Sequence, residues 1–198
     1  PAVMYDAGDG EGEKQLPASV GALGAYSYND RVGFEWFAPA GLSRGIIQNA
    51  TLPTVKLSKK NQDDLYESDV NPIISMPGRK VFINGQKTLQ VKNSSLDRVN
   101  VRRLLIFIRR QVREIANTLL FEPNRDSTLQ RFSTAVEPVL STVQSQAGLE
   151  RYQVRIDTTT TTQADVLNNT IRGKIFVQPT RTAEFISLDF EIQNPGTI

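Results

Sequence analysis

Two long amphipathic stretches in the second half of the chain constrain its fold more than any other feature. In the first stretch, apolar residues recur at spacings of three and four, which places them on one stripe of a helix. They are Val101, Leu104, Leu105, Ile108, Val112, Ile115 and Leu119. The second stretch covers about residues 127–146 and repeats the pattern with Leu129, Phe132, Val136, Val139, Leu140 and Val143. The sequence predicts two long helices, the first capped by Ser95 or Asp97 and ended by Pro123, the second kinked at Pro138.

Alternating segments after the helices predict strands. Apolar and polar residues alternate over residues 152–156 and 186–192, and residues 174–178 form a short apolar run. Each alternating strand has one polar face, which is typical of an antiparallel sheet with one face in water. We therefore predict an α+β fold, a mostly antiparallel sheet covered on one side by the two long helices, with extended terminal arms.

The first half of the chain contains only short sequence patterns that predict secondary structure. Small apolar residues with repeated glycine over residues 18–28 predict a short, closely packed strand, and residues 29–51 are expected to be irregular. Ser58 is positioned to cap a short helix that reaches residue 66. Asn84-Gly85 between two apolar runs predicts a hairpin with a type I′ turn.

The domain boundaries follow from composition. Residues 6–13 combine four acids with three glycines, which offers nothing to bury and a backbone that is costly to order. The carboxylates would repel a phosphate group, and the spacing of a calcium loop is absent. We predict a flexible acidic and glycine-rich linker over residues 1–16, an assembly domain over 17–192 and a C-terminal tail over 193–198.

The composition removes several chemistries. The chain contains no histidine and no cysteine, so imidazole bases, imidazole ligands, disulfides and thiolate sites are absent. The densest carboxylate cluster, in residues 63–69, is expected to be the solvated face of a short helix. The formal net charge is only +2, and no apolar run approaches the roughly 18 residues needed to cross a bilayer. We therefore expect no catalytic, metal or cofactor site and no membrane insertion.

Arginines are concentrated on and beside the first long helix. They are Arg98, Arg102, Arg103, Arg109, Arg110 and Arg113. One interpretation is a nucleic-acid-binding module whose guanidinium groups contact phosphates, although no aromatic residue interleaves them for base stacking. A second is bidentate pairing with carboxylates of a neighbouring subunit, and a third is a solvated face with local ion pairs.

Seven short strings resemble the C-terminal region of contractile tail sheath proteins, and they occur in the same order and spacing over about residues 17–192. They are Pro39-Ala40, Val70-Asn71-Pro72-Ile73, Pro77-Gly78-Arg79, Gly85 with Thr88-Leu89, Val101-Arg102-Arg103-Leu104, Phe121-Glu122-Pro123-Asn124 and Ala183-Glu184-Phe185-Ile186. Each string alone is weak evidence. Their shared order is what carries the resemblance, which covers nearly the whole chain.

The resemblance implies a structural subunit that stacks in hexameric rings around a tail tube and contracts to drive the tube through the host envelope. It implies a homopolymer whose other partners are the tail tube, baseplate and tail terminator proteins. The location would be the virion, after assembly in the host cytoplasm, and no direct contact with nucleic acid is expected. In the family, terminal strands are donated to neighbouring subunits. The candidate subunit or tube interface is therefore Arg102, Arg103, Arg109, Arg110, Arg113, Ile186, Leu188, Phe190 and Ile192.

Overall fold

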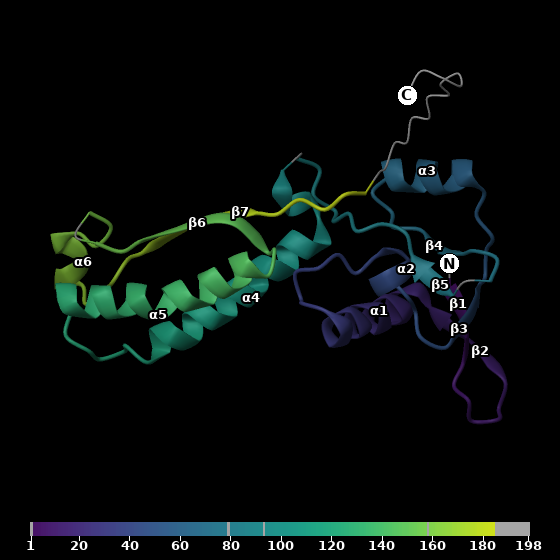
Figure 1. Cartoon of the computed structure of the whole chain (residues 1–198), viewed down its shortest axis with the longest axis horizontal. Helices are drawn as coiled ribbons and strands as arrows, with labels where there is room; N and C mark the ends of the chain where they lie inside the picture. The colour runs from purple at the N-terminus through teal and green to yellow at the C-terminus, as the bar shows by residue number, and fades with distance from the viewer. Residues whose placement is uncertain (1, 79, 93, 158, 185–198) are drawn as a thin grey trace, which may run out of the picture.

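The chain forms an elongated molecule with two lobes (Figure 1). The computed structural model describes residues 2–184 except 79, 93 and 158. One lobe contains the two long helices and the last strands, and the other contains the first three helices and the first five strands. Each lobe has its own hydrophobic core. The α+β class predicted from the sequence is confirmed.

The helical lobe is built as the apolar stripes predict. Helices α4 (Val99–Asn117) and α5 (Asp126–Ser145) lie on one side of an antiparallel pair, β6 (Leu149–Arg155) and β7 (Lys174–Pro179) (Figure 1). A short helix, α6 (Gln163–Leu167), lies in the connection between the strands. The core between these elements consists of Trp36, Leu104, Ile108, Val136, Leu140, Val143 and Leu149.

The ends of α4 differ from the prediction. Its first turn follows Arg98, which makes no side-chain cap, and Ser94 instead caps a short 3₁₀ helix, η1 (Ser95–Asp97), just ahead of it. The helix also ends at Asn117, before Pro123 is reached, and Phe121 in the turn has a positive φ of 68°. The chain therefore leaves the helix well ahead of the proline, and the sequence pattern does not predict the left-handed conformation of Phe121 within the turn.

The second lobe contains two small sheets. The first has the order β2-β1-β3, formed by β1 (Ala2–Asp6), β2 (Glu13–Pro17) and β3 (Ala50–Pro53) in antiparallel pairs. The second pairs β4 (Ile73–Ser75) with β5 (Val81–Ile83), also antiparallel. Their shared core consists of Val3, Ala25, Ile47, Val81 and Ile83. The strands of the described residues thus form three separate antiparallel sheets instead of the single sheet that was predicted.

Residues 18–28, predicted as a strand, are helical. They belong to α1 (Ala18–Val32), and a short α2 (Gly41–Arg44) follows. The buried residues Gly21, Ala25 and Asn29 of α1 are spaced by four and share one face. A Cβ at Gly21 would lie 3.2 Å from the side chain of Ile47, so the glycine allows a close approach of the helix to the core. The expectation of close packing was right and the expected element was wrong, because small residues serve close packing in helices as well as in strands.

The stretch predicted as a flexible linker contains β1 and β2, which form a hairpin. Only residues 7–12 between the strands are outside regular structure, and they make its exposed tip. The tip is ordered by local hydrogen bonds: the Asp6 carboxylate accepts from the Gly8 N–H at 2.8 Å, and the Asp9 carboxylate accepts from the Glu11 N–H at 3.0 Å. The pairing of β1 with β2 and β3 orders this stretch, although its acidic and glycine-rich composition has a low propensity for regular structure.

The Asn84-Gly85 pair does not form the predicted hairpin turn. The chain reverses direction earlier, between β4 and β5, where Gly78 has a φ of 69°. Gly85 is instead needed for space, since a Cβ there would lie 2.8 Å from the Asn71 side-chain oxygen.

The predicted helix after Ser58 is confirmed as α3 (Lys59–Glu67), and the Ser58 hydroxyl accepts from the Asn61 N–H at 3.2 Å. No helix in the described part of the chain has the length and apolar character needed to cross a bilayer.

Candidate assembly surface

The segment after β7 crosses from the helical lobe onto the other lobe (Figure 1). It begins with the Thr180 N–H, which donates to the Gly148 carbonyl at 3.2 Å. Two residues later, the Thr182 hydroxyl accepts from the buried Gln86 amide at 2.6 Å. The chain therefore bridges the lobes just before the C-terminal residues that were predicted to form a donated strand.

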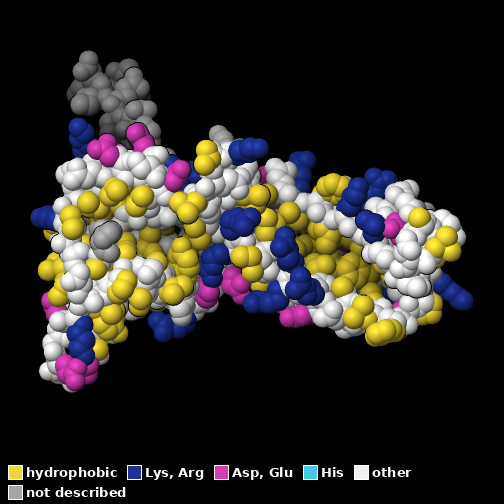
Figure 2. Space-filling view, turned by 180° about the vertical axis from the view of Figure 1, so that it is seen from behind, with side chains coloured by type: hydrophobic (Ala, Val, Ile, Leu, Met, Phe, Trp, Pro, Cys, Tyr) yellow, Lys and Arg dark blue, Asp and Glu magenta, His cyan; other side chains and the backbone are white. Residues whose placement is uncertain are grey.

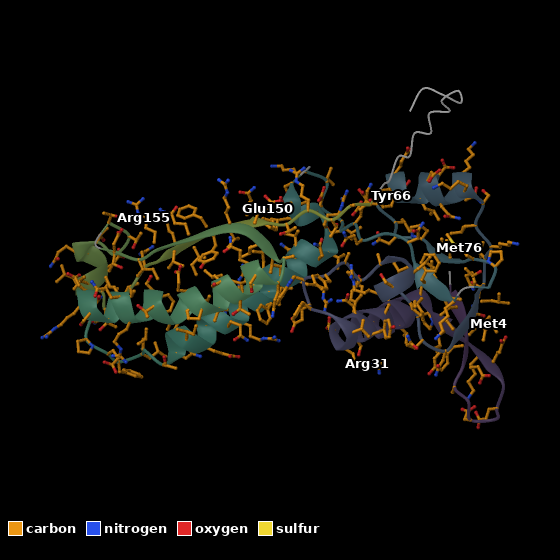
Figure 3. All side chains as sticks on the ribbon, in the orientation of Figure 1. Met4, Arg31, Tyr66, Met76, Glu150 and Arg155 are labelled. Carbon is orange, nitrogen blue, oxygen red and sulfur yellow. The ribbon has the colours of Figure 1, made fainter. Side chains whose placement is uncertain are left out.

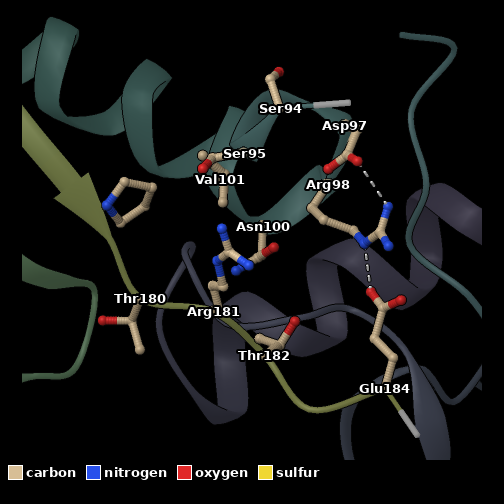
Figure 4. Close-up of a pocket in the computed structure, with 11 residues that line it drawn as sticks. Ser94, Ser95, Asp97, Arg98, Asn100, Val101, Thr180, Arg181, Thr182 and Glu184 are labelled. Carbon is tan, nitrogen blue, oxygen red and sulfur yellow. Dashed lines mark ion pairs between the residues drawn. The ribbon is translucent and has the colours of Figure 1, made fainter. Parts of the chain in front are cut away.

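The Glu184 carboxylate fixes the end of this bridge. One of its oxygens lies 2.8 Å from the Arg98 Nε and 3.1 Å from the Gln86 Nε2, and the other accepts from the Tyr66 hydroxyl (Figure 4 for Arg98). Figure 3 shows Tyr66 at the end of α3, beside the point where the C-terminal segment leaves the folded lobes. We call these four residues the Glu184 clamp.

The environment of the clamp favours the neutral form of Tyr66. Burial, the hydrogen bond to Glu184 and the negative charge of Glu184 raise the pKa of Tyr66 to about 12. The Arg98 guanidinium also lies 3.3 Å from Asp97, so one arginine serves two carboxylates (Figure 4). Most of the surface of both the Glu184 and Arg98 side chains is covered. The ion pair is therefore less screened by solvent than a fully exposed one.

Sequence reasoning found only part of this clamp. Arg98 was named with the arginine helix, and Glu184 occurs in one of the seven sheath-like strings. Tyr66 and Gln86 were not singled out, because they come from separate segments that only the tertiary fold brings together.

Two of the five candidate arginines are engaged within the chain. Arg103 binds both oxygens of the Asp30 carboxylate at 2.6 Å, and its guanidinium lies 5.4 Å from the Tyr26 ring centroid. Arg110 lies 3.0 Å from the Glu35 carboxylate. These two arginines attach α4 to α1 and to the aromatic segment that follows it.

The other three arginines face outward. Arg102, Arg109 and Arg113 share one face of α4 with Ile106, whose side chain is 61% exposed. No ion pair to them is found within the described residues. Figure 2 shows basic side chains gathered across the middle of one face of the molecule. We call Arg102, Arg109 and Arg113 the arginine stripe. The five-arginine surface predicted from the sequence is thus divided between structural ion pairs and this stripe.

The β6–β7 pair has free edges. Among the described residues, no third strand pairs with either of its members. One face packs on α4 and α5, and Phe176 on β7 is 51% exposed. A two-stranded sheet with unpaired backbone groups can accept a strand from another chain. The predicted donor residues Ile186, Leu188, Phe190 and Ile192 lie outside the described residues.

The described residues give no sign of a metal centre. Within them, no group of three or more acidic, cysteine or histidine side chains is arranged to hold a metal ion. Within the described residues, the candidate assembly surface consists of hydrogen-bonded groups, ion pairs and unpaired strand edges.

The fold is that of sheath proteins from contractile injection systems. It matches a chain of the anti-feeding prophage helical sheath in its contracted state with a TM-score of 0.82 and 26% identity, covering 98% of this chain and 54% of that one. It also matches a chain of the sheath complex of the extracellular contractile injection system PVC in the contracted state, with a TM-score of 0.85 and 24% identity. That match covers 98% of this chain and 55% of the other.

The chain belongs to the phage tail sheath C-terminal domain family, whose model matches residues 91–193. It is 30% identical over 175 residues to the tail sheath protein of Vibrio phage KVP40 and 29% identical over 175 residues to that of Enterobacteria phage T4. Each alignment covers 88% of this chain, but only 26% and 27% of the phage proteins. The chain thus spans about a quarter of these relatives, and the family indicated by the seven strings is confirmed.

Proposed function

We propose that this chain is the polymer-building domain of a contractile tail sheath subunit. It assembles in hexameric rings around a tail tube, and contraction of the polymer drives the tube through the host envelope. The observation that carries the proposal is the match of 98% of the chain to a subunit of a contracted helical sheath. Family membership supports the same assignment.

Strand exchange supplies the connections between subunits in this proposal. The free edges of β6 and β7 accept a strand, and the residues after Glu184 donate one to a neighbour. The Glu184 clamp supports this role because it fixes the point from which the donated segment starts. A fixed starting point reduces the conformational entropy that is lost when the segment pairs with another copy.

The arginine stripe provides electrostatic contacts with the tail tube or with the next subunit. Its guanidinium groups are exposed and have no ion-pair partner among the described residues, so they are available for carboxylates of another protein. The domain acts without catalysis, since contraction moves each subunit from one packing arrangement to another of lower free energy. Baseplate and tail terminator proteins are the further proposed partners, in a virion assembled in the host cytoplasm.

Truncation tests the proposal. Deleting residues 183–198 removes the donated segment but leaves both hydrophobic cores intact, so the variant should fold and remain unable to polymerise. The matched control deletes only residues 193–198, the predicted tail, and should polymerise. Circular dichroism checks folding, and sedimentation checks assembly. Long polymers formed by the larger deletion would contradict strand exchange.

A further inference from the structure

The turn between α4 and α5 presents an aromatic side chain to solvent. Phe121 is fully exposed, and its neighbour Leu120 is 62% exposed. The backbone of Phe121 has a φ of 68°, in the left-handed region that residues other than glycine, asparagine and aspartate rarely adopt. The chain therefore holds a bulky apolar group at an unfavourable backbone angle, although the group contributes no contact to its own core.

The turn is held by its other residues. The Asn124 side-chain amide donates to the Thr170 carbonyl at 3.1 Å, and the Thr128 hydroxyl donates to the Pro123 carbonyl at 2.7 Å. The Glu122 carboxylate lies 3.4 Å from Arg131. These contacts hold the backbone around Phe121, so the turn keeps the ring exposed at this end of the helix pair. This arrangement is typical of an anchor residue for a partner.

An apolar groove of ≈ 530 Å³ lies at the other end of α5. Its aromatic wall is built from Phe34 and Trp36, stacked with centroids 4.9 Å apart, and from Phe107, which meets Trp36 edge to face at 5.0 Å. Pro138 and Val139 of α5 also line the groove. A groove with aromatic walls suits an aromatic ring, because edge and face contacts add to the apolar area that is buried.

The groove cannot receive the Phe121 of its own copy. Thr142 lines the groove and lies sixteen residues beyond Asp126, where α5 begins. At the rise of an α-helix, this separation is about 24 Å. The ring and the groove therefore lie at opposite ends of a rigid helix, and any contact between them joins two copies.

The groove is lined by two carboxylates, Asp30 and Glu35, which are paired with Arg103 and Arg110. Glu122 follows the exposed ring and its side chain is 40% exposed, while Arg110 stands beside Glu35 and Phe107 at the groove and is 54% exposed. A carboxylate that enters beside the ring meets a guanidinium with free donor groups.

We propose that Phe121 of one copy inserts into the Phe34-Trp36-Phe107 groove of a second copy, with Glu122 directed at Arg110. Because each copy carries both a ring and a groove, one copy can contact two different neighbours through them, and such a heterologous contact adds subunits in a ring or a helical array. The inference rests on the proposed self-assembly of this chain and names one of the surfaces that carry it.

Cysteine cross-linking tests this contact, because the chain has no native cysteine. Chains carrying Leu120→Cys, which keep the Phe121 ring, are mixed with chains carrying Thr142→Cys, and a mild oxidant is added at the concentration used for assembly. We expect a disulfide-linked heterodimer on a non-reducing gel, formed at least tenfold faster than with a control partner that carries Leu89→Cys, a site 87% exposed and outside the groove. Adding Val139→Trp to the Thr142→Cys chain fills the groove and should abolish the cross-link.

A rate equal to that of the control pair, or a rate unaffected by Val139→Trp, would overturn the inference. Electron microscopy of the unmodified chain separates this failure from failure of the proposed function. Polymers that form while no cross-link appears reject the Phe121 contact alone. Absence of both polymers and cross-link rejects the two together, and a groove-dependent cross-link supports the contact even where only short oligomers form.

Discussion

Replacement of Glu184 by alanine should release the C-terminal segment without unfolding either lobe. The substitution removes the carboxylate that Arg98, Gln86 and Tyr66 share. No residue of the two cores lies beyond Pro179, so the cores are untouched. The effect should therefore be local.

The size of the effect follows from the three lost contacts. Glu184 accepts a charge-assisted hydrogen bond from Arg98 and two hydrogen bonds from the neutral donors Gln86 and Tyr66. The three contacts together are worth about 4 kcal/mol. In the variant, Arg98 still pairs with Asp97 and Gln86 still donates to Thr182, which reduces the loss to about 3 kcal/mol. Since each 1.4 kcal/mol is a factor of ten, the undocked fraction of the segment should rise about 100-fold.

Trypsin cleavage after Arg181 measures this fraction, because cleavage requires the segment to leave the surface. We expect a roughly 100-fold faster cut in Glu184→Ala and an intermediate rate in Glu184→Gln, which keeps hydrogen-bonding atoms without the charge. Glu150→Ala is the matched control, since Glu150 makes an exposed contact with Gln178 on the same strand pair. An unchanged cleavage rate in Glu184→Ala, with an unchanged melting temperature, would refute the clamp.

Two further predictions concern charge and pH. Reversal of Arg109 and Arg110 to glutamate should impair polymerisation or tube binding and change the free energy of unfolding by no more than about 1 kcal/mol, because the ion pair of Arg110 with Glu35 is exposed; normal contractile particles from this double variant would contradict the role. The raised pKa of Tyr66 means that its stabilising contribution is fully present below pH 10 and is lost as the pH rises toward 12. Ultraviolet titration against Tyr66→Phe should give a difference signal with a midpoint near 12, which falls in Glu184→Ala; a midpoint near 10 in the unmodified chain would contradict the buried environment of Tyr66 beside Glu184.

The sequence predicts the helical lobe well because periodicity controls it. The stripes of α4 and α5 are long enough to specify both the element and the buried face, and β6 alternates clearly. The boundaries of α4 were less accurate, since neither Ser95 nor Asp97 caps it and the helix ends before Pro123. Caps and turns depend on single residues, so a local pattern does not determine them.

The other lobe was predicted poorly for a different reason. Its elements are short, and tertiary pairing decides them: β1 is ordered by two neighbouring strands, and α1 uses Gly21 and Ala25 to approach the core. Residue propensities alone favoured a flexible linker where β1 forms and a strand where α1 forms. The Asn84-Gly85 pair failed similarly, because the space beside Asn71 and not a turn requires the glycine.

The candidate assembly surface could likewise be predicted only in part from the sequence. Exposure of Arg102, Arg109 and Arg113 follows from the helix periodicity that buries Leu104 and Ile108. The clamp could not be predicted, because Glu184 is 118 residues from Tyr66 and 98 from Gln86. Only the folded chain brings these groups together.

Electron microscopy of the purified chain tests the central claim most directly. We expect rings or hollow striated tubes as the protein concentration rises, since the proposed function places this domain in the polymer itself. Isolated particles at every concentration, from a sample that circular dichroism shows to be folded, would contradict the claim that the chain builds a sheath through contacts with its own copies.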